Sequence, residues 1–343
     1  MGADRRFSAA IALLCALVLA ASRPAPCAAQ GAAPAREHLR VSFMPFIGFG
    51  VFTLAQKEGY FAEQGLEVEF VALDRTYKGI PALAAGELDV HAGTPNAAIF
   101  NAIARGADIR FVAGKDYVPL AACAVDALMV RPDLAPAAGA PFDVARLRGK
   151  RIAVYSAAFD EYLLDRILAG KGLGLKDVER QTIPYPALAE AFRNGSVDAA
   201  IASEPWVTRL AQDKLAVEVV GAAAVTPGFE RSAIFFGPSL LRERPAVGER
   251  FMIAYLKAAR RFAEGKTERN VKILAEHTGL PEDFVRSICW STLRADGGVN
   301  VEGLVDFQAW AVRTGYLDGP VGPERFWEPR FTQRANAALG PGR

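Results

Sequence analysis

The sequence predicts an α/β protein with two similar lobes, each a mostly parallel sheet flanked by helices, and a helical C-terminal part. Two observations carry this prediction: segments with strand and helix periodicity alternate along the chain, and the pattern of the first half recurs in the second. The 343 residues allow two domains, at roughly 100–200 residues each. With 51% hydrophobic and 23% charged residues the chain can form a sizeable core, which excludes wholesale disorder.

The elements of the first half set the pattern for the second. The first half is expected to form a strand at 39–45, a helix at 49–59 and a strand at 66–72. The second half is expected to form the same elements at 151–155, 160–169 and 178–183. Gly65 in the first half, and Gly170 and Gly172 in the second, are typical of a helix C-terminus.

A more literal repeat follows in each half. The run PALAAGELD at 81–89 resembles PALA at 186–189 followed by GSVD at 195–198. Each copy predicts a short helix, a glycine turn and an aspartate that leads an apolar strand. Each strand then meets an X-Pro pair, Thr94-Pro95 or Glu204-Pro205, ahead of helices expected at 96–105 and 206–214, because proline is favoured where helices begin.

The chain is expected to cross between the lobes twice, near 118–126 and near 225–236, and to re-enter the first lobe through a strand at 233–236. Lobe 1 is therefore assigned residues 36–120 and 235–343, and lobe 2 residues 121–234. The helices expected in the C-terminal part lie at 248–262, 268–278, 282–291, 301–314 and near 331–339.

Charge and composition exclude several classes of function. Lys and Arg total 40 against 38 Asp and Glu, so the chain has no basic field of the kind that binds nucleic acid. Three histidines and four cysteines occur without metal-ligand spacing. We therefore predict no metal, no cofactor and no nucleic-acid partner. No nucleophile motif is present either, so we name no catalytic residue and expect a protein that is not an enzyme.

The N-terminal residues 1–29 have the pattern of a secretory signal. Arg5 and Arg6 precede an apolar run at 11–21, and small residues and prolines follow. The run is short for a membrane anchor, which takes roughly 20 apolar residues. Lipid attachment at Cys27 is the alternative, although the preceding Pro-Ala-Pro fits it poorly. We expect an exported mature protein that does not span the membrane and whose formal charge falls from +2 to near 0.

Removal of the signal leaves two cysteines, Cys123 and Cys289. In an oxidising compartment they can form one disulfide. Two buried free thiols are the alternative, and the sequence does not decide between them.

Ligands of open α/β sheets bind beyond the carboxyl ends of the strands, so two facing lobes are expected to share one cleft. Helix N-termini there offer N–H groups, aromatic rings offer apolar surface, and carboxylates accept from an amine or amide. The candidate ligand-binding residues are Phe46, Phe49, Thr94, Asn96, Tyr117, Ser156, Phe159, Asp160, Glu204 and Trp206, with Tyr185 a weaker candidate. Asp160 fits a helix N-cap equally well, Phe49 can belong to the core, and His91 is expected in the core.

Five segments of the chain resemble one known family. They are 54–70 (LAQKEGYFAEQGLEVEF), 85–90 (AGELDV), 102–108 (AIARGAD), 147–154 (LRGKRIAV) and 197–206 (VDAAIASEPW). Together they are similar to the nitrate/sulfonate/taurine-type solute-binding proteins of ABC importers, and to the thiamine-pyrimidine-synthesis branch of that superfamily. The resemblance covers residues 38–260.

The resemblance implies a type II periplasmic-binding fold that closes on a small solute and delivers it to permease subunits. Residues 156–160 (SAAFD) depart from the Gly, Ser and Thr that sulfonate and nitrate binders often carry there. This departure favours a neutral or amine-bearing organic solute, such as a heterocycle, over an oxyanion. The alternatives are an enzyme on the same fold, either a pyrimidine synthase or a desulfinase, and a sensory ligand-binding protein.

Overall fold

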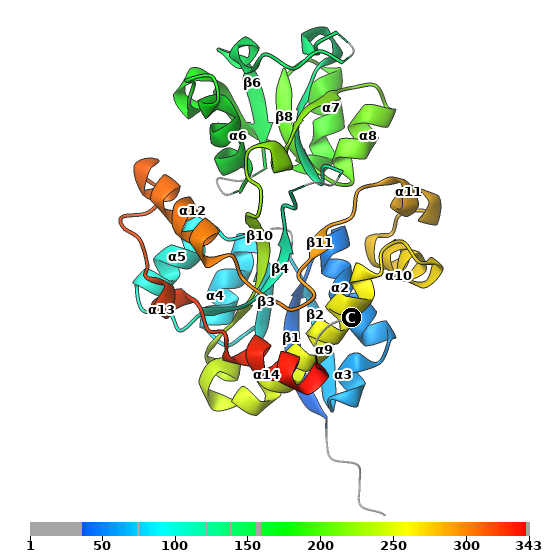
Figure 1. Cartoon of the computed structure of the whole chain (residues 1–343), viewed down its shortest axis with the longest axis vertical. Helices are drawn as coiled ribbons and strands as arrows, with labels where there is room; N and C mark the ends of the chain where they lie inside the picture. Colours follow the sequence, from blue (N-terminus) through cyan, green and yellow to red (C-terminus); the bar gives the residue numbers. More distant parts are fainter. Residues whose placement is uncertain (1–35, 74–75, 121–122, 138, 156–158, 341–343) are drawn as a thin grey trace, which may run out of the picture. The chain divides into compact units, whose positions relative to one another are not determined.

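The computed structural model describes residues 36–73, 76–120, 123–137, 139–155 and 159–340, and residues 36–343 form one compact unit (Figure 1). The secretory signal expected at 1–29, the lipid-attachment alternative at Cys27 and the candidate Ser156 lie outside the described residues. None of the described helices is long and apolar enough to cross a membrane.

Two sheets organise the unit. The six-stranded sheet has the order β11-β4-β10-β3-β1-β2, and the five-stranded sheet has the order β7-β6-β8-β5-β9. The strands of the first are β1 (Glu37–Phe43), β2 (Leu66–Ala72), β3 (Val90–Gly93), β4 (Arg110–Tyr117), β10 (Glu230–Phe236) and β11 (Thr292–Leu293). Those of the second are β5 (Asp126–Val130), β6 (Arg151–Val154), β7 (Glu179–Thr182), β8 (Ala199–Ser203) and β9 (Val217–Gly221).

Both sheets are mixed, with parallel strands on one side and antiparallel strands on the other. β1 pairs in parallel with β2 and β3, and β6 pairs in parallel with β7 and β8. The antiparallel strands belong to the two crossings: β10 pairs with β3 and β4, and β5 pairs with β8 and β9. A crossing strand enters its sheet at the end where the neighbouring strands leave it. It is therefore antiparallel to those neighbours, and no crossover helix is needed.

Helices flank both sheets, as the alternating pattern predicts. Segments that belong with the six-stranded sheet carry α2 (Gly50–Lys57), α3 (Tyr60–Glu63), α4 (Gly79–Ala84), α5 (Ala97–Ala104), α9 (Pro245–Ala263), α10 (Glu268–Thr278), α11 (Glu282–Ser287), α12 (Val301–Arg313), α13 (Pro323–Phe326) and α14 (Arg330–Leu339). The five-stranded sheet has α6 (Phe159–Ala169), α7 (Leu188–Arg193) and α8 (Trp206–Gln212).

Two helices differ from the sequence expectation. The helix expected at 49–59 begins as a 3-10 turn, Ile47–Phe49, continues as α2 and ends before Gly59, whose φ of 78° no regular helix accommodates. The helix expected at 282–291 ends at Ser287 because Ile288 is fully buried in an extended conformation and leads the chain toward β11. This extended segment brings residues 289–291 to the five-stranded sheet.

The repeated Gly…Asp pattern corresponds to the same contacts in both halves. Gly86 and Gly195 have φ near +72°, which is the left-handed region that favours glycine. The Asp89 carboxylate accepts the backbone N–H of Arg40 on β1 at 2.8 Å, and Asp198 accepts that of Arg151 on β6 at 3.0 Å. Each aspartate therefore fixes the strand it leads beside a parallel neighbour in its own sheet, β1 or β6.

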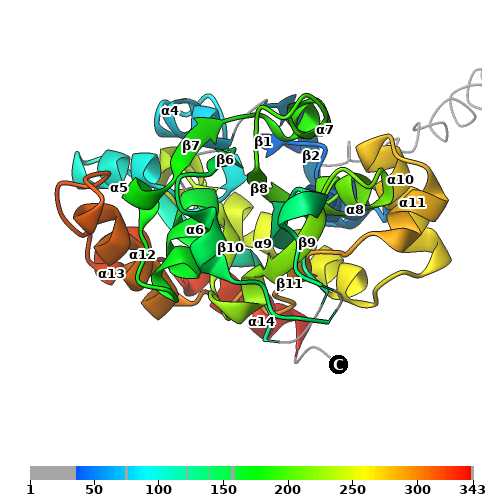
Figure 2. The ribbon, with the colours of Figure 1, turned by 90° about the horizontal axis from the view of Figure 1, so that it is seen from above.

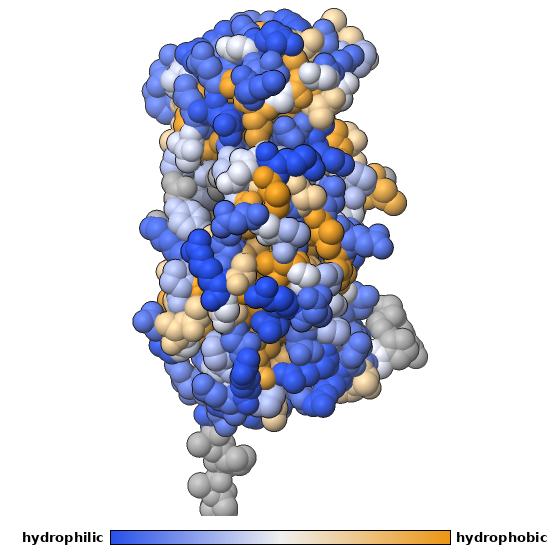
Figure 3. All heavy atoms as spheres, turned by 90° about the vertical axis from the view of Figure 1, so that its left-hand side faces the viewer, coloured by the Kyte–Doolittle hydropathy of each residue, from blue (hydrophilic) through white to orange (hydrophobic). Residues whose placement is uncertain are grey.

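The C-terminal part packs against both halves of the unit. In α12, Trp310 lies edge-on to Tyr162 of α6 with ring centroids 5.4 Å apart, and the Tyr162 hydroxyl donates to Asp306 at 2.6 Å. Figure 2 shows α12 beside α6 from above. The face drawn in Figure 3 is mostly hydrophilic, with smaller hydrophobic patches toward its middle. The apolar side chains of α6 and α12 thus join one core that includes residues of both sheets.

Candidate functional site

A cleft lies where the carboxyl ends of the parallel strands of both sheets meet. Its empty space, together with the open solvent at its mouth, is about 770 Å³. Its lining combines charged, hydroxyl and aromatic side chains with one glycine-containing apolar turn at residues 46–49. The lining residues are Phe46, Ile47, Gly48, Phe49, Thr94, Lys115, Asp116, Val125, Asp126, Tyr155, Phe159, Asp160, Tyr185, Ser203, Glu204, Arg231, Ser232, Cys289 and Ser291.

Most of the described candidates from the sequence lie at this cleft. Those that line it are Phe46, Phe49, Thr94, Phe159, Asp160, Glu204 and the weaker candidate Tyr185. Trp206, the first residue of α8, stands directly behind the lining. Its ring packs on Phe46, with centroids 5.7 Å apart, and on Tyr185, with centroids 5.2 Å apart.

Besides Trp206, two candidates do not line the cleft. Asn96 is the N-cap of α5: its side-chain oxygen accepts the N–H of Ile99 at 3.1 Å, and its amide donates to the Thr94 carbonyl at 2.9 Å. Tyr117 ends β4 and lies under the guanidinium of Arg294 at 4.1 Å. Both side chains thus already have structural partners.

The sequence reading missed the charged floor of the cleft. Lys115 and Asp116 end β4, Asp126 begins β5, and Arg231 and Ser232 lie near the start of β10. Each stands at the end of an otherwise apolar strand. A charge in such a position is costly unless it is paired, so these interruptions were the signal that pointed to a site.

Arg231 connects the two sheets at the centre of the floor. Its guanidinium donates to Asp116 of β4 at 2.6 Å, to Ser203 of β8 at 2.6 Å and to Asp126 of β5. Asp116 also accepts the hydroxyl of Ser232 and lies 3.3 Å from the ammonium of Lys115. One arginine therefore joins carboxylates of both sheets.

The floor is electrostatically self-contained. Burial favours the neutral form of Lys115 and lowers its pKa, even though Asp116 opposes this. Burial alone would raise the pKa of Asp116, but the positive charges of Lys115 and Arg231 outweigh it and keep that pKa below its usual value. Asp116 is therefore an ionised carboxylate, although the residue is only 1% exposed.

Asp160 occupies a different environment on the wall formed by the five-stranded sheet. Its carboxyl accepts the backbone N–H of Tyr155 at 2.8 Å and the hydroxyl of Tyr185 at 3.1 Å. Burial raises its pKa to about 7, although the N–H bond from Tyr155 opposes the rise. Its side chain faces the cleft instead of serving only as a helix cap.

Glu204 follows β8 and lines the same wall. Its carboxyl accepts the Thr208 hydroxyl at 2.7 Å, the Thr208 N–H at 3.1 Å and the backbone N–H of Cys289 at 3.0 Å. Burial raises its pKa despite these donors. The bond to Cys289 is also a contact between the segment before β11 and the five-stranded sheet.

A buried histidine, His277, positions the turn at Phe46 on the side of the cleft formed by the six-stranded sheet. The Nε2–H of His277 donates to the Phe46 carbonyl at 3.0 Å, so its Nδ1 accepts the Thr53 hydroxyl at 2.8 Å. Burial lowers the pKa of His277 to about 4. The imidazole is therefore neutral and carries its proton on Nε2. In this tautomer it fixes the backbone of the turn that presents Phe46.

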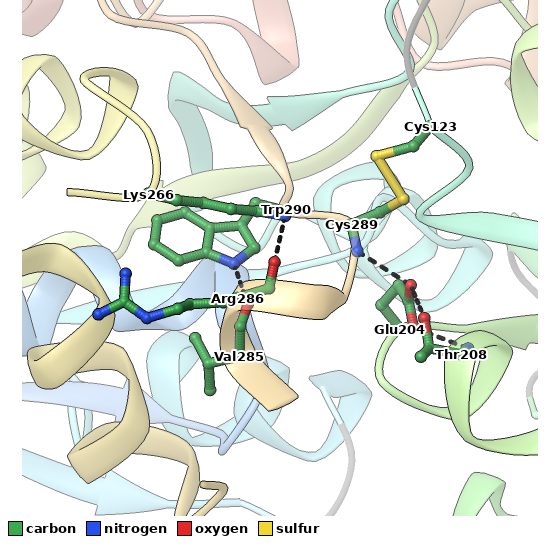
Figure 4. The surroundings of a disulfide bond; sticks show 8 residues. All are labelled: Cys123, Glu204, Thr208, Lys266, Val285, Arg286, Cys289 and Trp290. Atoms are coloured by element: carbon green, nitrogen blue, oxygen red, sulfur yellow. Dashed lines mark hydrogen bonds between the residues drawn. A yellow bond between two sulfur atoms is a disulfide. The ribbon is translucent and has the colours of Figure 1, made fainter. Parts of the chain in front are cut away.

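Cys123 and Cys289 form a disulfide, with their Cα atoms 5.8 Å apart. Figure 4 shows the bridge joining the first crossing segment to the segment before β11, with the Cys289 N–H directed at Glu204. Of the two alternatives for these cysteines, the disulfide is the one the structure contains. Both cysteines of the described residues are therefore paired.

Asp160→Asn is expected to gain stability relative to the wild type as the pH rises. A carboxyl whose folded-state pKa is raised stabilises the fold below its unfolded-state value and loses this contribution as the pH rises through about 7. The unfolding free energy of the variant should therefore rise relative to that of the wild type by up to about 1.4 kcal/mol per pH unit between about pH 5 and pH 7. Denaturant titrations at several pH values measure it. Parallel pH profiles for the two proteins contradict the assignment, and the exposed Glu190→Gln is the control.

Comparisons with known proteins place the chain in a family. A sequence model described as NMT1/THI5 like matches residues 47–265. No curated protein sequence matches the chain.

Solved structures of similar fold cover most of the chain. One is a ligand-binding component of an ABC-type import system from Staphylococcus aureus, with 14% identity, 88% of this chain and 99% of that one covered, and a TM-score of 0.71. Another is the alkanesulfonate-binding protein SsuA from Xanthomonas axonopodis pv. citri, with 20% identity, 86% and 99% covered, and a TM-score of 0.65. The desulfurization enzyme DSZB is similar too, with 17% identity, 89% and 100% covered, and a TM-score of 0.60.

At these identities the structures share the fold, including the two-lobed architecture expected from the sequence. The sequence model covers more than half of the chain, begins at Ile47 directly after Phe46, and includes the floor and both carboxyls of the wall. The chain therefore belongs to the NMT1/THI5-like family.

Proposed function

We propose that the chain is the periplasmic solute-binding receptor of an ABC importer, which closes two lobes on a small organic solute and releases it to permease subunits. The observation that carries this proposal is the cleft: charged and aromatic side chains from both sheets converge on one space. Apolar walls with a few placed polar groups are typical of a small-molecule site. Lobe closure on the solute then shifts the population from open to closed forms.

The proposed lobes are residues 36–120 with 235–343, and residues 121–234. Sheet membership supports this division except at its last boundary, because β5 to β9 lie in one sheet while the whole of β10, Glu230–Phe236, lies in the other. Since β10 begins at Glu230, the return crossing lies between β9 and β10. The two crossings then act as the hinge around the floor.

The competing function is a desulfinase-like enzyme, which the fold of DSZB favours. Such an enzyme needs a cysteine nucleophile, and a thiolate is the nucleophilic form of cysteine. Cys289 lines the cleft, but its sulfur is bonded to Cys123. The pairing supports a receptor that performs no chemistry.

A thermal-shift screen tests the proposal directly. The panel contains sulfonates, nitrate, pyrimidines, aromatic acids and amines, with product analysis of every mixture. A raised melting temperature with the solute recovered unchanged supports a receptor. A panel with no shift, or turnover of any solute, overturns it. A permease and an ATPase encoded beside this chain further favour transport over sensing.

Trp206→Ala is expected to weaken solute binding much more than His91→Ala. Trp206 is half-buried and supports Phe46 and Tyr185 at the cleft, and removing an aromatic anchor commonly costs about 2 kcal/mol or more in binding free energy. His91 is buried elsewhere, stacked on Phe235 and bonded to Ser42 at 3.0 Å. Calorimetry with any solute that the screen identifies compares the two variants. Equal losses would count against this cleft as the binding site.

A further inference from the structure

The charged side chains of the cleft do not balance. Among the described residues, its lining holds four carboxyl groups and two cationic groups. Both cations belong to the floor. Lys115 lies 3.3 Å from Asp116, and Arg231 bonds to Asp116 at 2.6 Å and also to Asp126. The floor thus pairs two positive with two negative charges and leaves the other two carboxyls to the wall.

Asp160 and Glu204 are those two carboxyls, and no described cationic side chain lies within ion-pair distance of either. Asp160 accepts from Tyr155 and Tyr185, and Glu204 accepts from Thr208 and the Cys289 N–H. All of these donors are uncharged. Burial raises the pKa of both carboxyls and the negative charge of Asp126 adds to the rise, while Arg231 opposes it at Asp160 without pairing with that residue. A buried carboxyl without a cation is the natural partner of a positively charged ligand group.

Flat aromatic surface adjoins the two carboxyls. The rings of Tyr155 and Tyr185 are stacked with centroids 4.6 Å apart, and Tyr185 also contacts Trp206. Phe46 faces Trp206 from the other sheet. The faces of such rings attract a cation that lies against them, particularly where water is excluded.

We propose that the cleft selects a planar cationic solute, an amidinium, a guanidinium or a protonated amino-heterocycle, whose N–H groups donate to Asp160 and Glu204 while its plane lies against the aromatic rings. This inference rests on the proposed receptor function and names the charge class of its solute. It follows from the geometry that an oxyanion finds no unpaired cation among the described lining residues. A bound cation, by contrast, supplies the missing charge.

Binding of such a solute is linked to the protonation of the wall. Burial raises the pKa of Asp160 to about 7 and also raises that of Glu204. A cation favours the ionised carboxylates, so its binding releases protons. The groups that face Asp160 are Asp126, Arg231 and Tyr185. Those that face Glu204 are Thr208, Cys289, Asp126 and Glu218.

Three probes of the same shape separate the charge classes: benzamidine, which is a cation, benzamide, which is neutral, and benzoate, which is an anion. Isothermal titration calorimetry on the mature protein is expected to show benzamidinium binding at least about tenfold more tightly than benzamide, and no benzoate binding. Raising the pH from about 5.5 to about 8 should strengthen benzamidinium binding at least about threefold and leave benzamide unchanged, because only the cation gains from ionised carboxylates.

Glu204→Gln and Asp160→Asn test the residues, since each amide keeps the shape of the acid and removes its charge. Each variant should lose at least about tenfold in benzamidinium affinity and change benzamide affinity less than about threefold. Glu190→Gln on the exposed face of α7 is the matched control and should retain wild-type affinity for all three probes. Circular dichroism confirms that each variant is folded.

The outcomes separate this inference from the receptor function. Three results overturn the cationic class. Benzoate binds more tightly than benzamidinium, benzamidinium does not bind, or Asp160→Asn and Glu204→Gln bind benzamidinium as tightly as the wild type does. The receptor function survives any of these results if another solute of the screening panel raises the melting temperature of the protein and is itself recovered unchanged. It falls with the inference if no solute does.

Discussion

Replacing Arg231 with methionine is expected to lower the free energy of unfolding by about 3–5 kcal/mol, the usual cost of removing one partner from a buried ion pair. Asp116 is 1% exposed and Asp126 3% exposed, and both depend on this guanidinium. Methionine keeps much of the side-chain volume but supplies no charge, so Asp126 loses its ion-pair partner and Asp116 keeps only Lys115. Chemical denaturation followed by circular dichroism measures the effect.

Two further variants show that the effect comes from the buried pairs. Arg148→Met removes a largely exposed arginine that pairs with Asp177, and it should cost no more than about 1 kcal/mol. Arg231→Lys keeps the charge but loses the fork that reaches Asp116, Asp126, Ser203 and Ser291, so its stability should lie between wild type and Arg231→Met. A loss in Arg231→Met no larger than that in Arg148→Met contradicts the role of the floor.

The sequence predicts local and repeated features of this fold well. The aspartate of each repeat reads as a marker at the start of a strand, and the structure shows the bond behind it: Asp89 to the Arg40 N–H and Asp198 to the Arg151 N–H. Such features depend on residues within one β-α-β unit, which a pattern in one stretch of chain reveals. The mixed character of the sheets depends instead on where the crossings enter, and periodicity does not encode this.

The same distinction applies to the site. Strand-end reasoning led to Phe46, Thr94, Asp160 and Glu204, because each directly follows a strand or opens a helix beside one. It also led to Asn96, whose side chain caps its own helix. A cap and a ligand contact require the same residue type in the same position, so only three-dimensional placement distinguishes them.

The floor was missed for a different reason. Arg231 and Asp116 are 115 positions apart in the chain, and Arg231 and Asp126 are 105 apart. A single sequence contains no signal that pairs such distant charges. Each of these charged residues, taken alone, is typical of an exposed strand end. Their common role arises because β10 begins at the same end of the sheet at which β4 finishes.

Loss of the disulfide is expected to lower the free energy of unfolding by about 2–5 kcal/mol, the range typical for native bridges. The bridge joins residues separated by 166 positions. A cross-link over so long a loop strongly restricts the unfolded chain, and the entropy model gives about 5 kcal/mol as its upper value. The double variant Cys123→Ser/Cys289→Ser removes the bridge and keeps the side-chain size, and denaturation compares it with the wild type.

The bridge should also affect the cleft, because the Cys289 N–H that bonds to Glu204 at 3.0 Å belongs to the bridged segment. The double variant is therefore expected to bind its solute more weakly, chiefly through faster dissociation as that segment gains freedom. Reductant should destabilise the wild type to the same degree, with two thiols becoming reactive, and should leave the double variant unaffected. If wild type with two titrated thiols is as stable and binds as tightly as the oxidised protein, the disulfide neither stabilises the fold nor orders the Glu204 wall.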